Sequence, residues 1–124
     1  PLRNVTNLLN EKTYTLDATI PIIECNGRIE AVAGVMGARE SEVSDATNSI
    51  VLETALFDSV MVRKATKTLG VRSESSNRFE KHVDASGVLL AVARVHELLA
   101  QHDNIQVQEP TFKGDLTQQT TAID

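Results

Sequence analysis

The pair Asn26-Gly27 is the turn signal that most restricts how this chain can fold. Asn-Gly favours the two-residue turn of a β-hairpin, because both residues tolerate a positive φ. Short β-prone runs lie on either side of the pair, at residues 20–25 and 28–33. We therefore predict one hairpin here. Further strands are predicted at residues 2–5, 14–16 and 105–107.

The second half of the chain has helical patterns. Asp58 or Ser59 can cap a helix that runs to Leu69, and Gly70 follows where helices commonly end. Strands in the first half and helices in the second predict an α+β fold. With 124 residues, of which 41% are hydrophobic, we expect a single domain over residues 1–124.

Several general features of the sequence limit the class of protein and its cellular location. The chain opens on Pro1 without an initiator methionine, so we expect a piece of a longer protein. No apolar stretch approaches the ~20 residues that a membrane-spanning helix requires, so no membrane partner is expected. Cys25 is the single cysteine and forms no internal disulfide. A reducing, cytoplasmic location fits best.

Charge is unevenly spread along the sequence. Residues 61–82 hold six basic and two acidic side chains, a net charge of +4 in a chain of net charge −5. Such a run is most simply a solvated helix face, and it can also receive the end of a polyanion. Aromatic residues are too few for a stacking platform, which argues against a general nucleic-acid-binding surface.

A polar run, residues 73–84, separates the first helix from a longer one predicted over about residues 85–101, with Asp84 as its cap. A polar segment between rigid elements often carries a site. Its three serines could form a triad with His82 only through folding, and hydroxyls at this density more often cap helices and turns. The histidines lack metal-ligand spacing, so no metal site is expected.

Glu53 is the unusual residue of a further predicted strand. Residues 49–55 have an apolar centre, which predicts a strand buried on both faces. Within it, Glu53 either points to solvent or lines a pocket. In a pocket its carboxylate would need a partner, and a ligand hydroxyl is one candidate.

A series of motifs now points to a family. In order they are Ala-Gly-Val-Met-Gly-Ala at 33–38, Ser-Glu-Val at 41–43, Leu-Glu-Thr-Ala-Leu-Phe-Asp at 52–58, Leu-Gly-Val-Arg-Ser-Glu-Ser-Ser at 69–76, and Arg-Phe-Glu-Lys-His-Val-Asp at 78–84. In order and spacing they resemble the β subunit of bacterial phenylalanyl-tRNA synthetase, most closely over the motif core 33–84. The resemblance implies a three-layer α+β unit, with packed mixed β-sheets and outer helices.

The resembling region of that subunit is its editing module, which hydrolyses tyrosine misattached to phenylalanine-specific tRNA. The resemblance implies that Glu53 accepts the tyrosine hydroxyl and that Gly37 keeps the pocket open. Ser73 matches a hydroxyl position of the family, and Ser75 falls where the family commonly has alanine. No catalytic side chain is indicated, so a positioned water is expected. None of the three histidines matches the one that the family uses.

The resemblance also implies partners and cofactors. They are the tRNA 3′ end carrying tyrosine or phenylalanine, and the α subunit of an α2β2 heterotetramer. ATP and magnesium would serve the parent enzyme, and no cofactor is expected in this module. Two alternatives remain: a non-catalytic structural or tRNA-positioning module of the same subunit, and a freestanding hydrolase of mischarged tRNA.

Overall fold

The computed structural model describes residues 3–5 and 7–114. It divides the chain into two compact units. Unit 1 comprises Pro1–Leu52 and Phe57–His82, and unit 2 comprises Glu53–Leu56 and Val83–Asp124. The chain therefore crosses between the units three times. The single domain over residues 1–124 stays a prediction.

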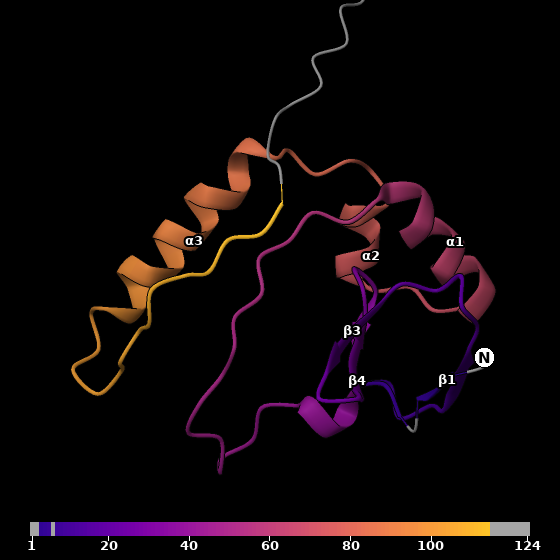
Figure 1. Cartoon of the computed structure of the whole chain (residues 1–124), viewed down its shortest axis with the longest axis horizontal. Helices are drawn as coiled ribbons and strands as arrows, with labels where there is room; N and C mark the ends of the chain where they lie inside the picture. The colour runs from indigo at the N-terminus through magenta and orange to yellow at the C-terminus, as the bar shows by residue number, and fades with distance from the viewer. Residues whose placement is uncertain (1–2, 6, 115–124) are drawn as a thin grey trace, which may run out of the picture. The chain divides into compact units, whose positions relative to one another are not determined.

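Two small antiparallel sheets form in unit 1. β1 (Arg3–Val5) pairs with β2 (Tyr14–Leu16). The second sheet has the order β3 (Ile22–Cys25), β4 (Arg28–Val32) and β5 (Met36–Gly37). Figure 1 shows β3 and β4 side by side. The predicted hairpin is confirmed as β3 and β4, with φ values of 50° at Asn26 and 79° at Gly27. Both positive values suit the tight turn that Asn-Gly favours.

The helices of unit 1 are the 3-10 turn η1 (Arg39–Ser41), α1 (Ser59–Leu69) and α2 (Glu74–Phe79). α1 is confirmed as predicted. The Asp58 carboxylate caps it by accepting from the amides of Val60 and Met61, each at 2.9 Å. Gly70 ends it with a φ of 63°, the left-handed conformation that glycine adopts without strain.

The core of unit 1 joins its sheets to α1. Val62 and Ala65 face inward from α1, and an edge-to-face pair of Phe57 and Phe79 packs against the same core, with ring centroids 4.8 Å apart. Because these apolar groups leave water together, they hold the strands and the helix in one unit. The buried core residues are Leu8, Leu16, Ile20, Val32, Val35, Val62, Ala65 and Val71.

Unit 2 contains α3 (Ser86–Leu99). The helix begins with Ala85 at its N-cap position, one residue later than predicted, while Asp84 accepts from the Ser86 amide at 2.9 Å. Its apolar stripe is only partly covered: Val88 is 8% exposed, whereas Leu89 is 58% exposed. No helix within the described residues is both long enough and apolar enough to span a membrane.

Four sequence predictions differ from the structure or lie beyond it. The strands predicted at 49–55 and 105–107 are absent, because neither run pairs with another strand in the described chain. The Thr- and Gln-rich run 117–121, whose composition predicts a frayed or truncated boundary, lies outside the described residues. The α+β class is confirmed, and the described strand pairs are antiparallel where mixed sheets were expected. Short connections explain this, since parallel neighbours need long crossovers.

Candidate functional site

The start of α2 is a reciprocal cap built from serines. The Ser73 hydroxyl oxygen accepts from the Ser76 amide at 3.0 Å, and the Ser76 hydroxyl oxygen accepts from the Ser73 amide at 2.9 Å. Ser76 is completely buried. This capping box satisfies amides that the first turn of a helix otherwise leaves unpaired. It explains why part of the polar run forms a helix that its composition did not predict.

The same end of α2 is tied to the turn between β4 and β5. The Ser73 hydroxyl donates to the carbonyl oxygen of Val35, and the Ser75 hydroxyl donates to that of Gly34 at 3.3 Å. A hydroxyl has one hydrogen to donate, and both serines use it on this turn. Ser73 and Ser75 therefore fix the backbone that leads into β5, and towards a ligand their oxygens can only accept.

Gly37 lies at the end of that backbone, in β5. Its carbonyl oxygen accepts from the Leu9 amide at 3.1 Å. A Cβ added at Gly37 would come within 3.4 Å of the Leu9 side chain, an ordinary contact. Packing in the described part of unit 1 therefore tolerates a side chain here. Gly37, Ser73 and Ser75 all belong to unit 1, where the turn at 34–35 connects them.

Gly34 is a residue of this turn whose neighbours the sequence did not reveal. Its φ is 67°, and an added Cβ would lie 2.9 Å from both the Phe57 ring and a Val62 methyl. No side chain fits in that space. The signal in the sequence was the repeated glycine after a strand, which indicates close backbone approach but does not say what approaches.

Glu53 belongs to unit 2, in a segment that has neither helix nor strand. The strand predicted to carry it is wrong. The residue is exposed, and partial desolvation by the surrounding chain still raises the pKa of its carboxyl above the ordinary value of 4.5. A carboxylate that loses part of its hydration favours a hydrogen-bond donor as partner. Its role in a pocket stays a prediction.

The alternative serine-histidine site does not form in unit 1. His82 contacts Ser59, with 3.4 Å between Nε2 and Oγ, whereas the serines of the polar run bond to backbone or to one another. His82 has a φ of 37° and is exposed. The geometry thus favours the capping role of these hydroxyls over nucleophilic catalysis.

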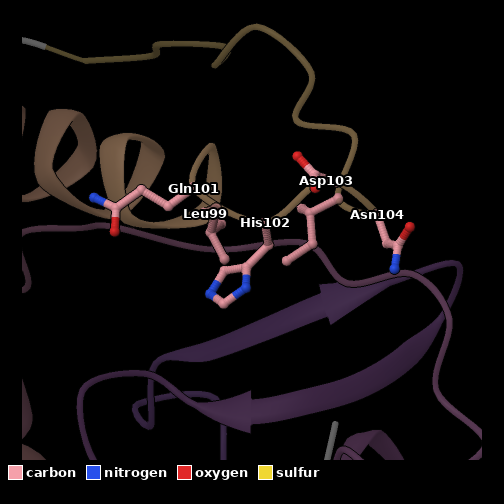
Figure 2. A pocket seen from close by; sticks show the side chains of 6 residues that line it. Leu99, Gln101, His102, Asp103 and Asn104 are labelled. Carbon is pink, nitrogen blue, oxygen red and sulfur yellow. The ribbon is translucent and has the colours of Figure 1, made fainter.

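A shallow hollow of about 490 Å³ lies at the C-terminal end of α3. Figure 2 shows the His102 imidazole and the Gln101 amide beside Leu99 on its wall. The hollow contains none of the predicted site residues. Within the described residues no three His, Cys, Asp or Glu side chains gather in a way that could hold a metal ion.

Comparison with known proteins settles the family. The B3/4 domain family matches residues 4–104, most of the chain. The chain belongs to the B3/4 domain family. All four predicted site residues lie inside the matched range, as do α1, α2 and α3. The match thus covers the α-helices of both units.

Curated relatives of this B3/4 domain are named as phenylalanine–tRNA ligase beta subunits. The one from Bacillus subtilis is 43% identical over 107 residues, 86% of this chain and 13% of the relative. Those from Thermotoga maritima and Clostridium tetani are 47% and 36% identical, over 74% and 94% of this chain. The chain spans only 12% and 15% of those two relatives. The predicted resemblance to this β subunit is confirmed.

Proposed function

We propose that this B3/4 domain is the editing module of a phenylalanine–tRNA ligase β subunit, which hydrolyses tyrosine misattached to phenylalanine-specific tRNA. The observation that carries the proposal is the B3/4 match together with β-subunit relatives at 36–47% identity over most of the chain. The parent enzyme would be a cytoplasmic α2β2 assembly that joins phenylalanine to tRNA with ATP and magnesium. This module would need neither cofactor.

The chemistry of the two amino acids explains why such a module is useful. Tyrosine is phenylalanine plus one hydroxyl. An apolar pocket at the aminoacylation site only weakly rejects an analogue that adds a hydroxyl. A second site can recognise that hydroxyl positively. Glu53 suits the task, because its carboxylate accepts hydrogen bonds and partial desolvation raises its pKa. Phenylalanine would leave that acceptor unpaired, at a cost of about 1–3 kcal/mol.

Residues 34–37 would form the wall of the pocket beside the aromatic ring of the bound amino acid. Packing in unit 1 leaves room for a Cβ at Gly37, so the space that a side chain would occupy there is available for a ligand. Ser73 and Ser75 hold this turn through its two carbonyl oxygens. Their proposed contribution is to fix the wall. The Ser75 oxygen can also accept a hydrogen bond from the substrate, whereas the Ser73 oxygen already accepts one from the Ser76 amide.

Hydrolysis would proceed through a positioned water. The water oxygen attacks the ester carbonyl carbon, the bond to the ribose oxygen breaks, and a proton passes to that leaving oxygen. The products are free tyrosine and tRNA with a free terminal hydroxyl. Positioning the water against the ester accounts for catalysis without a nucleophilic side chain.

The test is release of tyrosine from tyrosyl-tRNA by the full enzyme that carries this chain. Glu53→Ala and Gly37→Trp should each slow the release about ten-fold or more, since each removes a contact or space worth at least ~1.4 kcal/mol. Lys12→Ala, at an exposed site outside the proposed pocket, is the matched control. Release unchanged in both site variants would overturn the assignment of the site.

The same assay separates the alternatives. A structural or tRNA-positioning module predicts that the wild-type enzyme releases no tyrosine although it charges tRNA normally. A freestanding hydrolase predicts that the 124-residue chain alone releases tyrosine at the rate of the full enzyme.

A further inference from the structure

Two arginines contact Glu80 where α1 and α2 meet in unit 1. Arg63 of α1 donates from Nη2 to the carbonyl oxygen of Glu80 at 2.9 Å. Arg72 approaches the Glu80 carboxylate, with 3.6 Å between Nη2 and Oε2. Lys67 lies one helical turn after Arg63 and shares its side of α1, and Lys81 follows Glu80 in the chain. We call these four cations the α1–α2 basic face.

Glu80 organises this face without neutralising it. Its side chain is only 13% exposed, and its carboxylate also accepts from the Thr66 hydroxyl at 3.3 Å. The face thus holds four cations and one carboxylate. The Arg72 side chain is 68% exposed, and both lysines are exposed, so the positive groups face water. Figure 1 shows α1 and α2 side by side in this unit.

We propose that the α1–α2 basic face binds the phosphodiester backbone of single-stranded RNA; resting on the proposed function, that RNA is the 3′-terminal strand of the tRNA. Guanidinium groups match phosphate oxygens in shape, and contacts to Glu80 hold Arg63 and Arg72 in place before binding. The rest of the chain is strongly acidic, so repulsion confines a polyanion to this face.

The α1–α2 basic face would recognise the negative charge of the phosphates and not the identity of the bases. Phe57 and Phe79, the aromatic residues nearest to it along the chain, are partly buried and pack against each other in the core of unit 1. They therefore offer no stacking surface to bases. Binding should be weak, tolerant of sequence and strongly dependent on salt, which suits a strand that must enter and leave.

The experiment measures fluorescence anisotropy of a labelled single-stranded RNA of mixed sequence, titrated with the 124-residue chain over a series of salt concentrations. The variant is the double charge reversal Lys67→Glu with Lys81→Glu, which leaves both arginine contacts to Glu80 in place. Its affinity at low salt should fall at least ten-fold. The slope of log affinity against log salt should shrink by about 1.4, or about 0.7 for each phosphate that a lysine no longer neutralises.

The matched control is Lys12→Glu with Lys113→Glu, which makes the same change in net charge at exposed sites outside the face. It should leave the affinity within about two-fold of the wild type. Equal losses in both double variants would overturn the proposal, because overall charge would then explain the binding. Binding to anionic phospholipid vesicles with none to RNA would overturn it too. Circular dichroism confirms that each variant folds.

Failure of this proposal differs from failure of the editing proposal. If the wild-type enzyme releases no tyrosine while RNA binding depends on Lys67 and Lys81, the basic face stands and the editing function falls. If tyrosine is released and neither lysine affects RNA binding, the editing function stands and the basic face falls.

Discussion

At the scale of single residues, two glycines three positions apart have different physical roles. Gly34 adopts a positive φ and lies against Phe57 and Val62, so the fold itself requires glycine there. Gly37 has room for a Cβ beside Leu9, so the fold does not require it. The sequence shows both as the same letter. Only the distances to neighbouring side chains separate a structural glycine from one whose empty space is available for a ligand.

This difference predicts opposite effects on stability. Gly34→Ala should lower the free energy of unfolding by about 1–3 kcal/mol, because the new methyl overlaps the Phe57 ring in a strained backbone conformation. Gly37→Ala should change it by less than about 1 kcal/mol. Urea denaturation of both variants measures the contrast. Equal losses at the two positions would contradict this account of the turn.

A second residue-scale prediction concerns pH. The raised pKa of Glu53 means that its carboxylate begins to take up a proton at a higher pH than an ordinary glutamate. A protonated carboxyl accepts the tyrosine hydroxyl less well, so preference for tyrosyl over phenylalanyl ester should fall as pH drops through that raised pKa. Rates of ester hydrolysis for both substrates across acidic pH test this. In Glu53→Gln the preference should not vary with pH in that range.

The same pKa shift fixes the sign of the effect of Glu53 on stability. Because the folded-state pKa is raised, folding favours the protonated form, and the contribution of Glu53 to stability is lost as pH rises through that pKa. Glu53→Gln should therefore not destabilise the chain at neutral pH. Loss of activity in this variant would then report on function.

At the scale of elements, local sequence signals predicted correctly those elements whose backbone hydrogen bonds form between residues close in sequence. The hairpin of β3 and β4 needs only its Asn-Gly turn, and α1 needs only its Asp58 cap, its apolar face and Gly70. Residues 49–55 failed as a strand because a strand needs a neighbour, which sequence does not specify. α2 was missed because its stability comes from the cap at Ser73 and the contacts to the β4–β5 turn.

The cap of α2 gives a prediction at this scale. Ser73→Ala removes one acceptor for the Ser76 amide and one donor to the Val35 carbonyl, so it should cost about 1–2 kcal/mol of unfolding free energy. Ser73→Thr keeps the hydroxyl and should recover most of that loss. Chemical denaturation of the three proteins is the measurement. A stable Ser73→Ala variant would mean that the Ser73 hydroxyl contributes little to holding the turn.

At the scale of the whole molecule, burial is concentrated in unit 1. Its core holds eight buried residues, whereas Val88 is the one buried side chain of α3 in the described chain. The candidate site is divided between the two units in the same way. The sequence motifs identified its four residues, but the burial and the hydrogen-bond partners of each residue depend on the unit to which it belongs. Three of them lie in unit 1, where Ser73 and Ser75 bond to the turn that precedes Gly37, and Glu53 belongs to unit 2. Spacing along a chain does not reveal such a division.

Unequal burial predicts unequal protection of the backbone. Amide hydrogens of α1, such as that of Val62, should exchange with solvent much more slowly than those of α3, because opening α1 exposes the core of unit 1. Native-state hydrogen exchange followed by NMR measures both helices in one sample. Equal protection in α1 and α3 would show that the two units open together.

Proteolytic cleavage of the exposed segment 49–52 can report whether a ligand is bound at Glu53. These residues are exposed, with Val51 at 98%, and they lead directly to Glu53. Backbone that presents itself in this way is where a protease cuts a folded protein first. A ligand that engages Glu53 would shield the neighbouring peptide bonds, so the speed of cleavage near Val51 offers a label-free gauge of occupancy at the proposed acceptor.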